Sequence, residues 1–249
     1  MTAVVDAGGP AAHPGRLGGA LVDPSVVLAA ALADLHLASR GWARRPGEAA
    51  GPHLLRLSDS EIRRAAGGRA TAAADLHHRV TLGPALTVTA LRAGDRTGAS
   101  PGRALARLDI RLPPGTDPGP VLADVQHRLV RAAPPGVRVT LEGVSAHRGH
   151  EFVPGPRLRR EIEAASHTGF GQPPAYLRSG GTIPAVGALA ETFRTTPVLL
   201  GLGTPKGGAH GPDERMDLRG WARSVDTCIA LMARIGGLAQ EWRGRELRN

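Results

Sequence analysis

The sequence predicts an α/β protein of the α+β kind, in which a two-layer βαββαβ domain precedes a second, α/β segment. Two observations support this. Strand-like alternation and helix-start signals follow one another twice within residues 1–145, and residues 146–249 combine helical stripes with one short apolar run. The chain has 249 residues, of which 41% are hydrophobic, so it can bury a sizeable core.

The first half of the βαββαβ pattern begins with a weak strand at Val4 and Val5. Asp23-Pro24 is typical of a helix start, because an aspartate can cap the first turn and proline fits its first position. Apolar residues then recur at helical spacing, at Val27, Leu28, Ala31, Leu32 and Leu35.

Residues 39–80 are predicted to be a loop insertion. The stretch 39–53 is rich in Gly, Pro and Arg, which favours irregular structure. Further on, Ser58 and Glu61 have the spacing of a capping box, which predicts a short helix over 62–66.

A strand-like run at 86–91 ends the first half of the pattern. The run 103–112 then alternates strictly and predicts a half-buried antiparallel strand, with Arg103, Arg107 and Arg111 facing away from the core. A helix start at Asp117-Pro118 and an alternating run at 137–142 complete the order strand, helix, strand, strand, helix, strand. Two βαβ-like halves of this kind form a ferredoxin-like sandwich.

A boundary is predicted near residues 145–155, where Gly, His and Pro cluster. Beyond it, helices are predicted over 158–167, 182–193 and from 218 to about 235. The apolar run 197–203 is too short for a helix, so it is predicted to be a buried parallel strand.

Composition excludes several classes of protein. The net charge of +9 invites a nucleic-acid interpretation, but the arginines are scattered and no aromatic residues are interleaved with them. Cys228 is the only cysteine, so neither an intrachain disulfide nor a thiolate zinc cluster is expected. No signal peptide or membrane-spanning stretch is evident, which predicts a soluble cytoplasmic protein.

The segment most suggestive of chemistry ends in the glycine-rich loop around His210. This loop follows the predicted strand 197–203, and α/β proteins place ligands just past such strands. A neutral imidazole there can bind a metal. Taken alone, a surface histidine in a turn is the simpler interpretation.

The surrounding motifs resemble the co-catalytic zinc metallopeptidase family of carnosinases, aminoacylases and succinyl-diaminopimelate desuccinylase. The similar segments, in the family's order, are His13-Pro-Gly-Arg-Leu-Gly-Gly19, Ala106-Arg-Leu-Asp-Ile-Arg-Leu112 with Gly115-Thr-Asp-Pro118, Gly180-Gly-Thr-Ile-Pro184, and Gly208-Ala-His210 with Asp213-Glu214. The long stretch at 39–80 makes the carnosine-dipeptidase branch the nearest. The resemblance implies a lid or dimerisation domain over 1–145 and the C-terminal part of the catalytic domain over 146–249.

The resemblance also implies roles for individual residues. His210 matches a ligand of one of two zinc ions, and Thr182, with the backbone N–H of Gly181 beside it, matches a substrate contact. Arg111 matches the lid arginine that holds the substrate carboxylate, which suits a forked guanidinium. His13 matches a histidine that reaches across a dimer and steadies the oxyanion. For Arg111 the alternative is a solvated strand residue, and for His13 a loop residue near a frayed terminus.

Most of the family's metal site is expected to be missing from this sequence. The family supplies a His-x-Asp pair, a bridging Asp and a Glu-Glu pair from its first half, and neither pair occurs here. One imidazole cannot hold two zinc ions, and hydrolysis also needs a carboxylate base. Lys206, close to the His210 loop, stands where related members usually carry an acidic residue. We therefore expect weak or no zinc binding and no hydrolysis by the chain alone.

Three functional hypotheses remain. The first is a split or truncated dipeptidase or amidohydrolase, acting on peptides or N-acyl amino acids when a separate chain supplies the missing half. The second is a non-enzymatic dimeric relic or binding module. The third is an Arg-rich nucleic-acid binder, for which salt-dependent binding to duplex DNA would be needed. The first two share an expected homodimer through the lid domain, with neither nucleic acid nor membrane as partner.

Overall fold

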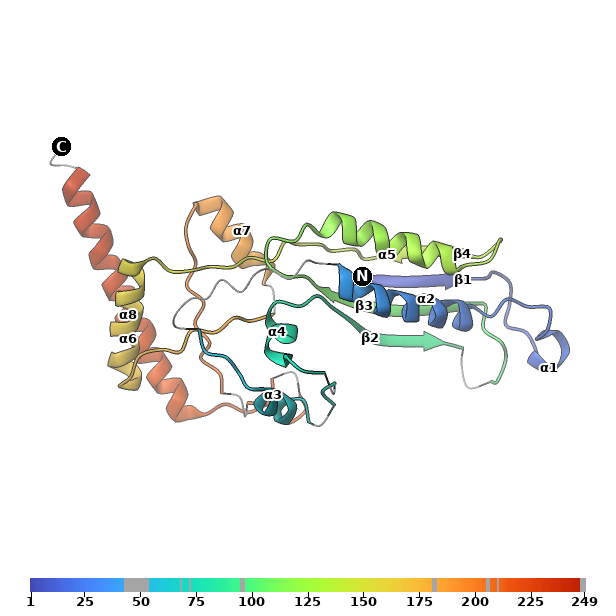
Figure 1. Ribbon diagram of the computed structural model, residues 1–249, viewed down its shortest axis with the longest axis horizontal. Helices are drawn as coiled ribbons and strands as arrows, with labels where there is room; N and C mark the ends of the chain where they lie inside the picture. The colour runs from blue at the N-terminus through green and yellow to red at the C-terminus, as the bar shows by residue number, and fades with distance from the viewer. Residues whose placement is uncertain are drawn as a thin grey trace. The chain divides into compact units, whose positions relative to one another are not determined.

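The computed structural model of the chain describes residues 1–42, 54–67, 69–71, 73–94, 97–180, 183–204, 207–209 and 211–246. The chain divides into two units (Figure 1), which are described separately below. Unit 1 comprises Met1–Ala49, Asp75–Glu151 and Ser179–Gly187, and unit 2 comprises Ala50–Ala74, Phe152–Arg178 and Ala188–Asn249.

Unit 1 is built on an antiparallel sheet with the strand order β2-β3-β1-β4. Its strands are β1 (Thr2–Asp6), β2 (Ala85–Ala93), β3 (Arg103–Arg111) and β4 (Arg138–Glu142). The weak strand predicted at Val4 lies in the middle of the sheet, where Val4 pairs with Leu105 of β3 and with Thr140 of β4. This strand order and the helices between the strands confirm the predicted βαββαβ architecture.

Two helices, α2 (Pro24–Ala38) and α5 (Pro118–Ala132), cover one face of this sheet (Figure 1). Each begins at the predicted signal: Asp23 accepts a hydrogen bond from the backbone N–H of Ser25 at 2.8 Å, and Asp117 accepts one from Gly119 at 3.0 Å. The core between helices and sheet consists of small and branched side chains, namely Ala3, Val5, Val27, Leu28, Ala31, Leu35, Ala104, Ala106, Leu108, Val121, Val125 and Leu129.

A polar network joins the two helices on their outer side. The Arg128 guanidinium donates to Asp124 at 2.9 Å and to Asp34 of α2 at 3.0 Å, while the Trp42 indole N–H donates to Asp124 at 2.7 Å. Partial burial raises the pKa of the Asp124 carboxyl, but the hydrogen bonds from Arg128 and Trp42 lower it by more, so that its pKa lies below the ordinary value.

Replacing Asp124 with asparagine should therefore destabilise the chain in a pH-dependent way. A carboxyl with a lowered folded-state pKa contributes stability above its unfolded pKa, which is about 3.9, and loses that contribution as the pH falls through the folded pKa. We expect Asp124→Asn to lower the free energy of unfolding by about 1 kcal/mol at pH 7 and by less at pH 3. Urea unfolding at both pH values measures this. An equal difference at both would contradict the assignment.

The stretch 39–80, predicted as a loop with one helix, contains more regular structure than expected. A 3₁₀ turn, η1 (Ser39–Gly41), follows α2, and α3 (Asp59–Ala65) forms with the predicted capping box, in which Ser58 N–H donates to Glu61 at 2.7 Å and Glu61 N–H to the Ser58 hydroxyl at 3.3 Å. The short helix α4 (Leu76–Thr81) was not predicted, and neither was α1 (Pro14–Leu17). Both are too short to show helical periodicity.

Unit 2 is centred on a pair of helices, α6 (Pro156–Phe170) and α8 (Leu218–Glu246). A shorter helix, α7 (Pro184–Phe193), begins in unit 1 and ends in unit 2. The buried cluster between α6 and α8 is small, with Ile162, Ala165 and Leu231 at its centre. The two helices approach closely at Gly169, where a Cβ would overlap the Thr227 hydroxyl and the Arg223 carbonyl of α8.

A methyl group at position 169 should therefore force the helix pair apart. The Arg223 carbonyl belongs to the backbone of α8 and cannot rotate away, so we expect Gly169→Ala to lower the free energy of unfolding of unit 2 by about 1–3 kcal/mol. Gly155→Ala is a matched control, because its Cβ would meet no atom within 4 Å. Thermal denaturation of both variants, followed by circular dichroism, measures the difference. Equal loss in the two would contradict close packing at Gly169.

The predicted buried strand at 197–203 is wrong for this structure. The segment belongs to no strand of the described chain, and Leu199 and Leu202 are exposed. A strand needs a neighbour for its backbone hydrogen bonds, and among the described residues none forms a β-bridge with this segment.

None of the helices in the described part of the chain combines the length and the apolar character needed to cross a bilayer.

Candidate functional site

Arg111, the proposed lid arginine, is the last residue of β3, and its guanidinium binds the end of α4. Nη1 donates to the carbonyl of Val80 at 2.9 Å, and Nη2 donates to the carbonyls of Arg79 at 2.6 Å and Gly83 at 3.1 Å. The last carbonyls of a helix have no partner within the helix, and a cation placed there also meets the negative end of the helix dipole. Arg111 therefore caps α4 from a neighbouring strand.

This arrangement uses the donors that a carboxylate would need. A guanidinium offers two forks, Nε with Nη2 and Nη1 with Nη2, and both N–H groups of Nη2 are bound to carbonyls here. Nε is buried and has no hydrogen-bond partner among the described residues. Burial lowers the pKa of Arg111, and the nearby Asp109 carboxylate acts in the opposite direction. A substrate carboxylate would therefore meet a guanidinium whose Nε has no partner among the described residues, while Nη1 and Nη2 already donate to backbone carbonyls.

The loop that leads to the next two candidates, Gly181 and Thr182, lies close to Arg111 at Gly180. Gly180 lies so close to the Val80 carbonyl and the Arg111 guanidinium that a Cβ at this position would overlap both. Gly181 and Thr182 follow directly and lie outside the described residues. The structure thus brings Arg111 together with the residue that precedes both candidates. Glycine is required at 180 by this close approach.

His13 lies elsewhere in unit 1. It precedes the short helix α1, where its backbone carbonyl accepts hydrogen bonds from Arg16 and Leu17 at 3.1 Å, and its side chain is exposed. An exposed imidazole on a surface turn is available to a second molecule.

The proposed metal ligand His210 lies outside the described residues, as does Lys206. The turn around them is described in part: Gly208 has a φ of 66°, and Arg215 N–H donates to the carbonyl of Gly207 at 2.8 Å. Among the described residues, no group of three or more His, Cys, Asp or Glu side chains is arranged to hold a metal ion. Together with the absence of His-x-Asp and Glu-Glu pairs from the sequence, these residues do not fit a two-zinc site by themselves.

The uncovered face of the sheet carries charges of both signs. Asp6 of β1 pairs in register with Arg103 on one side and with Arg138 on the other, and Arg103 forms an ion pair with Glu142 at 3.3 Å. Acidic groups placed between the arginines break up the uniform basic stripe that typifies a nucleic-acid surface.

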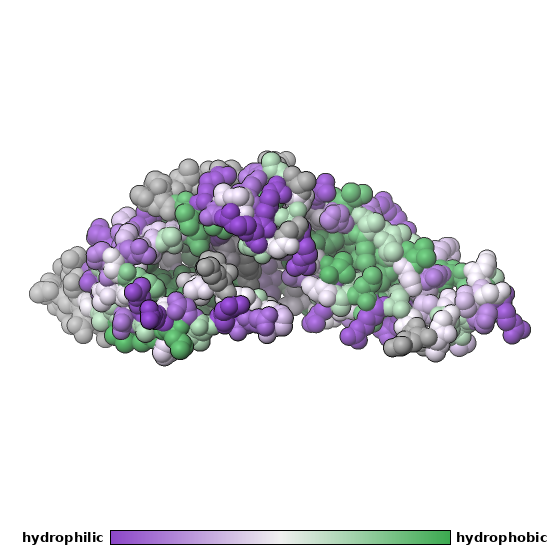
Figure 2. Space-filling view, turned by 90° about the horizontal axis from the view of Figure 1, so that it is seen from below, coloured by the Kyte–Doolittle hydropathy of each residue, from purple (hydrophilic) through white to green (hydrophobic). Residues whose placement is uncertain are grey.

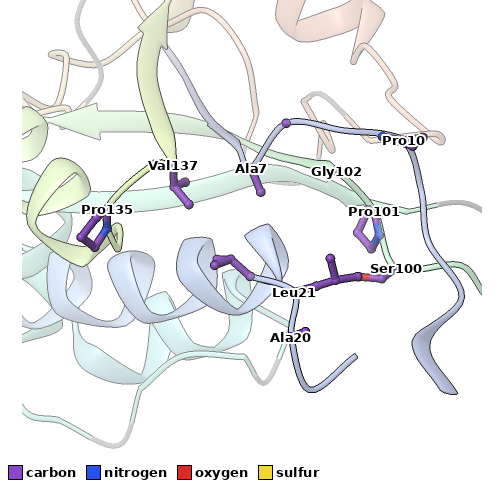
Figure 3. Close-up of a pocket in the computed structure, with 12 residues that line it drawn as sticks. Ala7, Pro10, Ala20, Leu21, Ser100, Pro101, Gly102, Pro135 and Val137 are labelled. Atoms are coloured by element: carbon purple, nitrogen blue, oxygen red, sulfur yellow. The ribbon is translucent and has the colours of Figure 1, made fainter. Parts of the chain in front are cut away.

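A recess of ≈ 290 Å³ lies at one end of the sheet in unit 1 (Figure 3). Leu21, Pro101, Pro135 and Val137 point into it, and the Ser100 hydroxyl is the one polar side-chain group of its lining. None of the predicted site residues lines it. Because its lining contains no acid, base or metal ligand, this recess has no side chain that could catalyse a reaction or hold a metal ion.

Sequence reasoning missed the α4 carbonyls, the close approach of Gly180 to Arg111, and the buried His78, whose Nε2 has no hydrogen-bond partner among the described residues. The sequence held a signal for α4, because Gly83-Pro84 is typical of the end of a helix. It held none for the contact between Arg111 and α4, because that contact joins residues about thirty positions apart.

Comparison with known families decides what unit 1 is. Residues 1–137, more than half of the chain, match the model of the peptidase dimerisation domain. The chain belongs to this family. No curated protein matches the sequence.

Solved structures extend the likeness of this dimerisation-domain protein beyond residue 137. It is similar to the dipeptidase Dug1p from Saccharomyces cerevisiae (19% identity, TM-score 0.76), to human carnosine dipeptidase 1 (21%, 0.69) and to the metallo-carboxypeptidase Sso-CP2 from Sulfolobus solfataricus (18%, 0.72). The matches cover 94%, 94% and 92% of this chain but 53%, 53% and 56% of those chains. The chain therefore spans about half the length of these structures, and the resemblance predicted from the sequence is confirmed at the level of family and fold.

The described residues of the dimerisation domain leave an apolar surface open, here called the α2–β2 face. Besides its buried side, helix α2 exposes a second apolar stripe, which runs from Val26 (65%) to Leu37 (66%) with Ala29, Ala30 and Ala33 between them at helical spacing. Strand β2, at the edge of the sheet, exposes Val88 and Leu91. Figure 2 shows hydrophobic side chains gathered over this part of unit 1. A continuous exposed apolar patch of this kind is typical of a surface that binds another protein.

Proposed function

We propose that the chain forms the lid and the C-terminal part of the catalytic domain of a metal-dependent peptidase, which hydrolyses dipeptides or N-acyl amino acids. The observation that supports this is the pairing of a dimerisation domain over 1–137 with a likeness to Dug1p that continues over 94% of the chain. That likeness spans only 53% of Dug1p, so the proposal includes a further polypeptide segment, continuous with this chain or separate from it.

In this proposal the chain supplies His210 as one zinc ligand and leaves the other ligands and the general base to that further segment. The zinc ions would polarise the scissile carbonyl and activate the attacking water. The 249 residues alone do not fit such a site, because a structural or catalytic zinc requires three or four protein ligands. The proposal also retains the cytoplasmic setting that is expected from the sequence.

The chain's own contribution is substrate binding. We assign to Arg111 the substrate carboxylate, to Thr182 and the Gly181 N–H a contact with the substrate near the scissile bond, and to His13 the oxyanion in the active site of a second copy. The close approach of Gly180 to Arg111 supports a shared location for Arg111 and the 181–182 loop. For Arg111 to receive a carboxylate, Nη2 must release at least one of the α4 carbonyls.

The proposed assembly is a homodimer through the α2–β2 face. The family description supports self-association, and the face combines an apolar helix with an unpaired sheet edge. A twofold axis would place the α2–β2 face of one copy against the same face of the other copy. Twofold dimers are the commonest arrangement among soluble oligomers. Such pairing also covers the edge of β2, which would otherwise be open to uncontrolled strand addition.

The test is hydrolysis with and without the complementary segment. The isolated chain should bind well under one zinc per chain and leave dipeptides and N-acyl amino acids intact. The completed protein should hydrolyse one of these classes, His210→Ala should reduce that rate at least about 100-fold, and the exposed His167→Ala on α6 should leave it unchanged. Hydrolysis by the zinc-loaded isolated chain would contradict the incomplete site. A completed protein that binds substrate without cleaving it would favour a binding module.

A further inference from the structure

The half-buried Arg111 guanidinium has no carboxylate as a hydrogen-bond partner. In the part of the chain that the structure describes, all of its hydrogen bonds go to backbone carbonyls, those of Arg79, Val80 and Gly83. The nearby Asp109 carboxylate acts on it only through space. The Nε atom is buried and has no partner among the described residues. Because enclosed charges are normally paired, an unpaired Nε on a cation of this kind points to an anionic ligand.

One edge of this guanidinium is covered by Gly180. A Cβ at position 180 would overlap both Nη1 of Arg111 and the Val80 carbonyl, so the Nη1 edge has no room for a further group. A carboxylate binds two parallel N–H groups, and the remaining edge for it is formed by Nε and Nη2. Both N–H groups of Nη2 donate to carbonyls, those of Arg79 and Gly83. A carboxylate can therefore bind that edge only in place of one of these carbonyls.

Helix α4, which supplies these carbonyls, has little stability of its own. It is six residues long, and helices of that length are not stable without tertiary contacts. Its first turn has no side-chain cap, and the preceding Asp75 has a φ of 60°, in the left-handed region that side chains rarely adopt. At its other end, the N–H groups of Leu82 and Gly83 both donate to the His78 carbonyl at 2.8 Å. Order in this last turn depends on the hydrogen bonds from Arg111.

We propose that the last turn of α4 is an autoinhibitory contact: its carbonyls occupy Arg111, and the turn must open before Arg111 binds the terminal carboxylate of a peptide or N-acyl amino acid. This inference rests on the proposed function, which assigns the substrate carboxylate to Arg111. Order in α4 and binding of the carboxylate then exclude one another, because both use the N–H groups of Nη2.

Such competition gives a result that a purely structural cap does not. A ligand normally slows amide exchange in the protein that binds it, because it stabilises the folded state. Here a bound carboxylate takes a donor away from α4, so exchange in the last turn of α4 becomes faster. By linkage the effect is reciprocal, and a substitution that weakens α4 makes the carboxylate bind more tightly. A permanent cap predicts neither effect.

The first experiment is hydrogen exchange on the 249-residue chain with saturating glycylglycine as the probe. Glycylglycinamide, which has no carboxylate, is the matched control at equal ionic strength. With glycylglycine the amides of Leu82 and Gly83 should exchange at least about 5-fold faster, while the buried Val125 of α5 changes less than about 2-fold. In Arg111→Ala the same two amides should exchange fast without any ligand and should not respond to it. Unchanged or slower exchange at Leu82 and Gly83 in the wild-type chain would overturn the proposal.

The second experiment weakens α4 without touching Arg111. Val80→Gly and Val80→Ala both remove an exposed side chain from α4 and keep the backbone carbonyl, but glycine is the poorer helix former. The dissociation constant of glycylglycine should be about 3–5-fold lower for Val80→Gly than for Val80→Ala. The same pair at the exposed Val130 of α5 is the matched control and should differ less than about 2-fold. Equal affinity of the two Val80 variants, or tighter binding by Val80→Ala, would overturn the proposal.

The readouts separate this inference from the proposed function. Faster exchange at Leu82 and Gly83 in a protein that hydrolyses nothing, even when completed, would retain the autoinhibitory contact and reject the peptidase. Hydrolysis by a completed protein in which these amides do not respond to glycylglycine would retain the peptidase and reject the contact. An equal response to inorganic phosphate would overturn the assignment to a carboxylate, because the site would then select charge alone.

Discussion

Replacing Val26 and Leu37 together with glutamate is expected to turn the proposed dimer of this chain into monomers. Both side chains are about two-thirds exposed on α2, and burial of one such side chain contributes about 1.5–3 kcal/mol. In a twofold interface each substitution is present in both copies, so its effect occurs twice, and the introduced carboxylates of the two copies repel one another. We expect the dimer dissociation constant to rise at least about 100-fold, which corresponds to about 2.7 kcal/mol.

Sedimentation at micromolar concentration measures this change. Val130→Glu is the matched control, because Val130 is an exposed apolar residue of similar environment on α5, away from the α2–β2 face. The control should remain a dimer. A wild-type chain that sediments as a monomer, or a control that dissociates like the double variant, would show that this face is not the interface.

Removing the guanidinium of Arg111 is expected to loosen α4. Arg111→Ala leaves the carbonyls of Arg79, Val80 and Gly83 without their charged donor. Hydrogen bonds to a charged group contribute about 1.5–3 kcal/mol each, and water recovers part of this at a partly exposed site. We therefore expect the free energy of unfolding to fall by about 2–3 kcal/mol in total, with faster amide exchange confined to α4 and the turn after it.

Two variants on the same strand sharpen this test. Arg107→Ala removes an exposed guanidinium from β3 and should change the free energy of unfolding by less than about 0.5 kcal/mol. Arg111→Lys keeps the charge but offers a point donor instead of a fork, and should recover about half of the loss. Unfolding in urea measures all three. If Arg111→Ala behaved like Arg107→Ala, the cap on α4 would contribute nothing.

The parts of this fold that follow local rules could be predicted from the sequence. Asp23 and Asp117 cap their helices as predicted, because a cap involves only the next two or three residues. The alternation of 103–111 predicted the buried side of β3 for the same reason. These local signals, taken in order, were enough to give the βαββαβ architecture.

What the sequence did not show depends on residues far apart in the chain. Whether 197–203 forms a strand depends on a neighbour that these residues do not supply, so an apolar pattern alone predicted too much. The contact between Arg111 and the three carbonyls could not be predicted for a related reason, because these carbonyls come close to Arg111 only when α4 packs beside the end of β3. The proposed roles of His13, Arg111, Gly181, Thr182 and His210 stay predictions.

The irregularity in β2 limits how two copies of this chain can join. The pairing of β2 with β3 shifts between Val88 and Ala90, so that a bulge interrupts the strand near its middle. A bulge bends and twists its strand locally, and the free edge is thereby divided into two short runs, 85–88 and 90–93. A continuous eight-stranded sheet through β2 would lose its ladder at that point. In the proposed dimer, contact between the copies would then come chiefly from the side chains of α2, so a peptide that mimics α2 should inhibit dimerisation better than a peptide that adds a strand to β2.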